Sequence, residues 1–294
     1  MDMFDALLYV ALVLFGLIFG SFAGATVWRL RARQLVADKK AGERVDHKEY
    51  LTLKSLATTT LSKDHSHCLH CGYELKWYDL IPLVSWLGLK GRCRKCRQPI
   101  GVFEPLIELG TAAFFVVSYA LWPVDITSPI PVIMFGLWLL AGVVLAILFA
   151  YDAKWFLLPD ALNFTLIGIG IISALVMIIG ANDHLAALLN VLGAVGVLSG
   201  IYLLLYLVSG GRWIGFGDVK LGLGLGLLLG DLQLAVLALF LANLIGCLIV
   251  IPLMITKKLK RDSHVPFGPL LIAGMIVAKL VGMIIIETYL LTLM

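Results

Sequence analysis

The sequence predicts an all-α polytopic membrane protein of about eight transmembrane helices, with a cytoplasmic zinc-binding domain between the first two. Three observations carry this prediction. Of the 294 residues, 61% are hydrophobic and 14% are charged, against about 25% charged in a typical soluble domain. The apolar residues are gathered into long blocks, and a helix needs ~20 such residues to cross the hydrocarbon core. Four cysteines lie together in one long hydrophilic segment.

Eight apolar blocks are candidate membrane spans. They cover residues 4–28, 105–122, 131–151, 163–179, 186–208, 213–230, 232–255 and 267–291. The first block is expected to remain as a helix rather than be cleaved as a signal peptide, because residues 1–5 contain two aspartates and no basic residue. The predicted domains are a first transmembrane helix (1–28), a cytoplasmic domain (29–104) and a seven-helix membrane domain (105–294).

The basic residues predict the orientation, because cytoplasmic loops are enriched in lysine and arginine. Fifteen of the 23 lie between Arg29 and Glu104, and Lys257, Lys258, Lys260 and Arg261 lie in the last connection. The connections at 124–129, 181–184 and 230–231 have none. We therefore expect a protein of the cytoplasmic (inner) membrane with segment 29–104 in the cytoplasm and both termini outward. The net charge of +4 follows from this topology and does not indicate nucleic acid.

The cysteines form two pairs, Cys68-x-x-Cys71 and Cys93-x-x-Cys96, separated by 21 residues. Two such pairs allow four thiolates to converge tetrahedrally on Zn²⁺, and the metal can fold a segment too small for its own core. Disulfides are disfavoured in the reducing cytoplasm, and no βαβ pattern supports a thioredoxin-like pair. The nearby histidines are further potential ligands: His65, His67 and His70. We predict a structural zinc site made by the four cysteines.

Three aspartates lie next to apolar blocks on the basic side of the membrane: Asp152, Asp160 and Asp218. Carboxylates at membrane depth are costly and are functional candidates by default. Asp152 follows the third block, and Asp218 lies in Gly-Phe-Gly-Asp at the start of the sixth. Asp160 follows Pro159 directly before an apolar helix, which is the position of an N-cap.

We expect Asp152 and Asp218 to form a catalytic pair. Like charges held close together cannot both ionise, so one carboxyl keeps its proton and polarises a carbonyl while the other activates a water. For Asp152 alone, a solvated interface residue is the alternative. Lys220 is two residues from Asp218 and does not share its helix face, so we expect it to extend to the cytoplasmic interface.

Glycines recur every fourth residue in two of the blocks. In the first block they are Gly16, Gly20 and Gly24, and in the sixth they are Gly222, Gly226 and Gly230. Such faces allow helices to approach closely. Packing of the first span against the sixth is a hypothesis that follows.

Together these motifs resemble bacterial type IV prepilin peptidases, the leader peptidase/N-methyltransferases, which are intramembrane aspartyl proteases of the GxGD type. The matching elements, in order, are Gly20-Ser21-Phe22, the cysteine pairs around Ile81–Trp86, Pro105–Glu108, Leu158-Pro159-Asp160, Gly217–Leu221 and Pro266–Pro269. The resemblance covers nearly the whole chain. Gly24 and Asn163 depart from the family, which usually has Asn and Thr there.

The resemblance implies two activities. The first removes the basic leader from type IV prepilin or pseudopilin precursors at the cytoplasmic face, with Asp152 and Asp218 as the catalytic aspartates. The second methylates the new amino terminus with S-adenosylmethionine. The sequence assigns no residues to the cofactor. Glu104 and Glu108 are candidates, although an interface role explains them more simply.

Three alternatives remain open from the sequence: a protease without methyltransferase activity, an ion-coupled transporter, and a membrane-anchored zinc domain that binds a partner. A transporter predicts ionisable groups along a continuous path across the bilayer, whereas here they cluster on one side. A zinc domain alone leaves Asp152 and Asp218 unexplained. The sequence does not specify the precursors, the pathway or whether the chain forms a homo-oligomer.

Overall fold

The computed structural model describes residues 3–57, 65–258 and 265–293, so Lys260 and Arg261 of the last connection lie outside it. The described residues form helices and connections, and the only β-type pairing among them is two isolated antiparallel bridges. The predicted all-α fold is confirmed. The chain divides into two compact units, Met1–Val117 and Ser118–Met294, which are described in turn.

In the first unit, the N-terminal helix extends beyond the apolar block from which it was predicted. α1 (Met3–Lys40) has 38 residues and runs on past residue 28. Its last turns share a small hydrophobic core with α2 (His47–Leu53) and a 3₁₀ turn (Lys54–Ala57); the buried members are Ala32, Leu35, Leu53 and Leu56. The hydrophilic C-terminal end of α1 is thus held in place by apolar packing. Arg31 adds a bidentate ion pair with Glu49.

Among the described residues of this unit, two further short helical elements precede its second long helix. They are a 3₁₀ turn (Trp77–Asp79) and α3 (Val84–Gly88), and the long helix is α4 (Phe103–Ala120). The glycine face of α1 packs against α4: a Cβ on Gly16 would lie 2.5 Å from the Cα of Ala112, and one on Gly20 would lie 2.5 Å from the Cα of Glu108. The close approach is as predicted, but the neighbour is the second span rather than the sixth.

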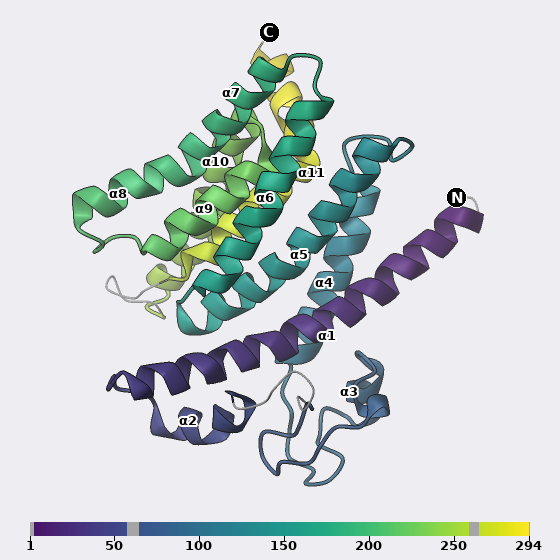
Figure 1. The fold of residues 1–294 in the computed structure, drawn as a ribbon, viewed down its shortest axis with the longest axis vertical. Helices are drawn as coiled ribbons and strands as arrows, with labels where there is room; N and C mark the ends of the chain where they lie inside the picture. Colours follow the sequence, from purple (N-terminus) through teal and green to yellow (C-terminus); the bar gives the residue numbers. More distant parts are fainter. Residues whose placement is uncertain (1–2, 58–64, 259–264, 294) are drawn as a thin grey trace. The chain divides into compact units, whose positions relative to one another are not determined.

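The second unit is a helical bundle (Figure 1). Its elements are α5 (Pro129–Trp155), α6 (Asp160–Gly180), α7 (His184–Val195), a π turn η4 (Gly196–Gly200), α8 (Ile201–Ser209), α9 (Phe216–Leu229), α10 (Leu232–Ile255) and α11 (Phe267–Leu293). α7, η4 and α8 form one continuous rod, since the residues at both junctions keep helical backbone angles. α9 lies inside the unit, in contact with α6, α7, η4, α8, α10 and α11.

Among the described residues, seven helices are long and apolar enough to cross a membrane; the eighth predicted span, 213–230, falls short. It is α9, which has 14 residues and a length of ~21 Å at 1.5 Å per residue. Glycines shorten it at both ends, because Gly215 is extended and Gly230 ends the helix in a left-handed conformation. The predicted membrane fold of about eight helices is confirmed, with this element shorter than the other spans.

α9 nevertheless runs beside α6 for most of that helix. A Cβ on Gly217 would lie 3.1 Å from Leu158, just before α6, and one on Gly230 would meet Met177 near the end of α6. The glycine face of α9 packs on the α7–η4 rod, where a Cβ on Gly226 would lie 2.9 Å from Val195 Cα. The hypothesis that this face packs on the first span was therefore wrong. α9 is a core helix whose ends reach the ends of its neighbour.

Lys279 of α11 is the basic residue that the sequence places inside a span. Its Nζ lies 3.4 Å from the carbonyl oxygen of Leu228 and 3.5 Å from that of Leu229. These carbonyls belong to the last turn of α9, where helical C=O groups have no partner within the helix and where a cation is favoured. The lysine therefore caps the short internal helix.

Candidate active site

Asp152 lies in the last turn of α5 with 5% of its surface exposed. The helix ends three residues later at Trp155, because Phe156 adopts a left-handed conformation with φ of 57°. Its carboxylate is held from outside its own helix: the backbone N–H of Gly268 donates to Oδ2 at 3.0 Å. Gly268 is the second residue of α11, where backbone N–H groups lack a partner within the helix and favour an anion.

Gly268 leaves no space for a side chain. A Cβ at this position would lie 2.7 Å from Oδ2 of Asp152 and 3.5 Å from Cδ2 of Leu158. Only a residue without a Cβ allows the start of α11 to approach the carboxylate this closely. The glycine of Pro266–Pro269 thus has a direct role in positioning Asp152.

Asp218 is the third residue of α9 and is half-buried. Its carboxylate lies beside Gly215, the N-cap residue, where a Cβ would be 3.5 Å from Oδ2. The start of a helix favours an anion at this position. Each aspartate thus lies near the start of a helix, Asp152 near that of α11 and Asp218 in that of α9. The two carboxyl groups interact electrostatically, so the fold brings together the two residues chosen from the sequence.

Leu158 joins three of the sequence motifs at this place. A Cβ on Gly217, in the motif of Asp218, would lie 3.1 Å from Leu158 Cβ, and one on Gly268, in the motif that holds Asp152, would lie 3.5 Å from Leu158 Cδ2. Motifs separated by more than 100 residues in the chain therefore meet around one leucine. Leu158 restricts the space at Gly217, whereas at Gly268 the closest atom is the Asp152 carboxylate oxygen.

Asp160 does not cap α6, and that prediction was wrong. Pro159 is the N-cap residue and Asp160 is the first residue of the helix. Its Oδ1 instead accepts a hydrogen bond from Lys220 Nζ at 2.6 Å, in an ion pair that joins the starts of α6 and α9. Lys220 is therefore engaged with Asp160 rather than extended alone to the interface.

Sequence reasoning missed Tyr202 of α8. The residue is 4% exposed, and its ring packs edge-on against Phe267 with 5.4 Å between centroids. Its hydroxyl interacts electrostatically with Asp218 and has no hydrogen-bond partner in the described part of the chain. The signal available in the sequence was a phenol inside an otherwise apolar block. Asn163 of α6 is also fully buried, with both amide atoms unpartnered among the described residues.

The four cysteines converge in the first unit. All four Sγ atoms lie within 4.8 Å of one another, and the pairs Cys68–Cys96 and Cys71–Cys93 are each separated by 3.9 Å. A tetrahedron with Zn–S bonds of ~2.3 Å has edges of about 3.8 Å, so the thiols fit zinc. They are free cysteines rather than disulfides. Burial raises the pKa of the Cys68 thiol to about 12, which a bound cation would oppose.

Both cysteine pairs sit on the same kind of tight turn. Each first cysteine donates its N–H across the turn, Cys68 to Tyr73 and Cys93 to Gln98. Two of the candidate histidines point elsewhere: His65 pairs with Glu74, and His67 Nε2 lies 3.1 Å from the Ser55 hydroxyl. The metal-type cluster found among the described residues contains the four cysteines alone.

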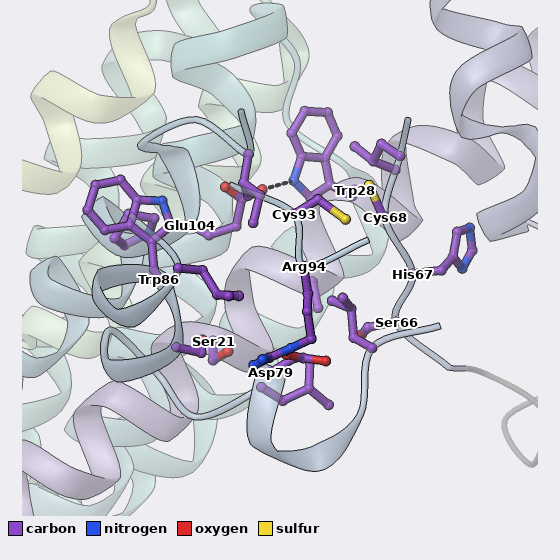
Figure 2. A pocket seen from close by; sticks show the side chains of 18 of the residues that line it. Ser21, Trp28, Ser66, His67, Cys68, Asp79, Trp86, Cys93, Arg94 and Glu104 are labelled. Carbon is purple, nitrogen blue, oxygen red and sulfur yellow. Dashed lines mark hydrogen bonds and ion pairs between the residues drawn. The ribbon is translucent and has the colours of Figure 1, made fainter. Parts of the chain in front are cut away.

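A cavity of about 230 Å³ lies beside the cysteine cluster within the first unit, and Figure 2 shows its lining. Trp28 of α1 donates its indole N–H to Glu104 Oε1 at 3.0 Å. The other carboxylate oxygen, Oε2, is buried without a hydrogen-bond partner in the region the structure describes. Glu108 also lines the cavity and accepts a hydrogen bond from the Leu83 N–H at 2.8 Å. The cavity thus combines anionic groups with indole rings, including that of Trp86.

A multi-helix membrane bundle with two interacting carboxyl groups at helix ends defines the class, a polytopic membrane peptidase. Residues 14–122 match the bacterial peptidase A24 N-terminal domain. Residues 138–251 match the type IV leader peptidase family. The chain belongs to the type IV leader peptidase family.

Relatives of known name support the same assignment over nearly the full length. The prepilin leader peptidase/N-methyltransferase of Pseudomonas aeruginosa is 33% identical, with 95% of this chain and 92% of the relative covered. The enzyme of the same name in Aeromonas hydrophila is 34% identical, covering 92% and 90%. The type 4 prepilin-like proteins leader peptide-processing enzyme of Escherichia coli is 33% identical, covering 88% of each. No solved structure matches the chain. The family resemblance read from the motifs is thereby confirmed.

Proposed function

We propose that this protein is an aspartyl endopeptidase that removes the leader from type IV prepilin or pseudopilin precursors, with Asp152 and Asp218 as its catalytic pair. The observation that supports the proposal most strongly is that the segment of Asp152 and the start of α9, which carries Asp218, meet at Leu158 and the start of α11. The two carboxyl groups there are near enough to interact electrostatically. The two aspartates come from α5 and α9, whose motifs are far apart in the sequence. Membership of the type IV leader peptidase family supports a peptidase activity.

The chemistry needs one protonated and one ionised carboxyl group. The ionised carboxylate takes a proton from a water, and the resulting hydroxide attacks the scissile carbonyl carbon. The protonated carboxyl gives its proton to the carbonyl oxygen. The tetrahedral intermediate then collapses, the C–N bond breaks, and the leaving nitrogen takes the proton that the first carboxylate accepted. As the C–N bond breaks, one hydroxyl of the intermediate returns its proton to the second carboxylate and becomes the carbonyl oxygen of the product. The pair therefore ends with one proton, as it began.

The position of the pair suits a substrate that is hydrophilic on one side of the cut and apolar on the other. Both aspartates lie at ends of helices, Asp152 at the end of α5 and Asp218 at the start of α9. A leader joined to an apolar helix places its scissile bond at that depth. The enrichment of basic residues in the connections on this side supports a reaction at the cytoplasmic face.

We further propose that Cys68, Cys71, Cys93 and Cys96 hold one structural Zn²⁺. Zinc supplies no reactive group there, since four thiolates leave no open coordination position. The thiolates fix the two tight turns relative to each other, in a segment with few buried apolar residues of its own. Because Cys68 and Cys93 also line the cavity, the folded cysteine cluster would shape one wall of it.

The cavity is the best candidate for the methyl-transfer site. S-adenosylmethionine supplies an electrophilic methyl group on a sulfonium cation. The unpartnered Oε2 of Glu104 offers a negative charge to that cation or to the substrate amine, and the indole rings of Trp28 and Trp86 offer π faces that attract cations. Trp28 fixes the orientation of Glu104 by its hydrogen bond (Figure 2).

The test of both activities is the mass of the product. Purified protein in lipid vesicles is incubated with a pilin precursor and S-adenosylmethionine, and the N-terminal peptide is weighed. We expect a leaderless peptide heavier by one methyl group. A leaderless, unmethylated peptide would retain the protease and overturn the methyltransferase. Intact precursor, across several substrates, would overturn the peptidase and favour the transporter alternative.

The cavity is tested separately with Glu104→Gln, which keeps the shape of the side chain and removes its charge. We expect cleavage to persist and methylation to fall. Glu43→Gln, which changes an exposed acid in the same unit, is the matched control. Methylation equal in both variants would exclude Glu104 from the methyl-transfer site.

A further inference from the structure

We propose that the Tyr202 hydroxyl is a third catalytic group of the peptidase site, one that donates a hydrogen bond to the oxygen of the tetrahedral intermediate. The inference rests on the proposed function, because it assigns a residue to the same reaction. The mechanism proposed above assigns no role to this phenol.

The hydroxyl is buried and unpartnered. Tyr202 is 4% exposed, yet its oxygen has no hydrogen-bond partner among the residues described. Buried side-chain hydroxyl groups nearly always have a partner, and exceptions in native proteins call for an explanation such as a catalytic role. A phenylalanine would fill the same space without this unmet polar group, so packing alone does not explain the tyrosine.

The surrounding contacts place the phenol at the catalytic pair. One turn earlier, the Ser199 hydroxyl donates to the Val219 carbonyl at 2.9 Å, which fixes this face of the rod against the first turns of α9. The ring of Tyr202 packs on Phe267 at 5.4 Å, the residue next to the glycine that holds Asp152. Its hydroxyl interacts with the Asp218 carboxylate. The phenol is thus fixed between the starts of α9 and α11, the two helix ends that hold the aspartates.

The chemistry leaves a role for one more donor. The backbone amide of Gly268 donates to the carboxylate of Asp152, not to a reacting oxygen of the substrate. While the hydroxide attacks, and before the carboxyl proton has fully transferred, negative charge develops on the former carbonyl oxygen. A fixed donor aimed at that position lowers the barrier. The Tyr202 O–H supplies such a donor in a water-poor setting. It keeps its proton throughout, so the proton balance of the two aspartates is unchanged.

The direct test is Tyr202→Phe, which retains the ring contact with Phe267 and removes only the hydroxyl. We expect kcat for leader removal to fall about 100-fold, as for the loss of one oxyanion donor, with KM and the melting temperature unchanged. Tyr206→Phe is the matched control. Tyr206 lies one turn further along α8 and packs on Phe216. We therefore expect the Tyr206→Phe variant to cleave precursor at the rate of the unaltered protein.

A second measurement separates catalysis from packing. Tyrosine at 202 is replaced by ring-fluorinated tyrosines, which keep the hydroxyl and change the acidity of the phenol. A donor to the reacting oxygen predicts that kcat varies with that acidity while the melting temperature stays constant.

The outcomes distinguish the inference from the proposed function. If the unaltered protein cleaves precursor and Tyr202→Phe has the same kcat, Tyr202 is not part of the catalytic centre although the peptidase stands. A loss of kcat accompanied by an equal loss in Tyr206→Phe, or by a lower melting temperature, would also overturn the inference. If the unaltered protein does not cleave, the proposed function falls and the inference falls with it.

Discussion

Oδ2 of Asp152 accepts a hydrogen bond from the backbone N–H of Gly268, 3.0 Å away and 116 residues further along the chain. The bond joins the last turn of α5 to the first turn of α11. The bond gives the buried carboxylate a hydrogen-bond donor. The Gly268 N–H is available for this because the first N–H groups of a helix have no acceptor within the helix. The glycine is required by space as well, since its Cα lies against both the carboxylate and Leu158.

Gly268→Ala should abolish most leader removal. The added methyl group would lie 2.7 Å from Oδ2 of Asp152, so the carboxylate must move. Misplacement of a reacting group by about 1 Å can cost about 100-fold in rate, and we expect a loss of that size in kcat with precursor in lipid vesicles. Gly136→Ala in the same α5 is the control, because a Cβ there meets nothing within 4 Å. Equal activity in both variants would contradict the account of Gly268.

Zinc should copurify with the chain at one ion per molecule, measured by elemental analysis of protein purified without added metal. Cys68→Ser should lower that content and reduce methylation more than cleavage, because Cys68 lines the cavity and the aspartates lie in the other unit. Cys247→Ser is the control, since Cys247 lies outside the cysteine cluster. Full methylation by a zinc-free chain would contradict both the structural role and the position of the cavity.

Lys279→Met should destabilise the membrane unit. The substitution removes the cation and donor that reach the carbonyl oxygens of Leu228 and Leu229, and a buried acceptor left without a partner costs ~1–3 kcal/mol. We expect a lower unfolding temperature in detergent, with leader removal retained at low temperature. Lys48→Met changes an exposed lysine of α2 and serves as the reference. An unchanged unfolding temperature for Lys279→Met would show that the contact does not stabilise α9.

The parts of the site that the sequence predicted are those in which residue type and spacing are decisive. Cys-x-x-Cys pairs restrict where four sulfurs can meet, and a carboxylate beside an apolar block has few structural explanations. Hence the cysteine cluster, and the choice of Asp152 and Asp218 as candidates on one side of the membrane, followed from local patterns, whereas the distance between the two aspartates did not. The apolar blocks predicted the helices because hydrocarbon thickness sets their length.

The parts that the sequence did not predict depend on contacts between distant segments. The pairing of Asp160 with Lys220 requires the starts of α6 and α9 to be neighbours, which no spacing encodes. The glycine faces indicated close packing but not the partner, because any helix can approach a small-residue face. Tyr202 gave no signal beyond its polarity. Its relation to Asp218 exists only once α8 and α9 are packed.

The central claim is that Asp152 and Asp218 act as one catalytic pair, and the most direct measurement is the rate of leader removal by Asp152→Asn and Asp218→Asn. Asparagine is nearly isosteric with aspartate but can neither act as a base nor carry the shared proton. Asp231→Asn is the control, because Asp231 caps α10 through the N–H of Leu234 and asparagine caps helices equally well. We expect each catalytic variant to lose at least about 10³-fold in rate while the control cleaves normally. Cleavage by either catalytic variant at the rate of the control would contradict the account.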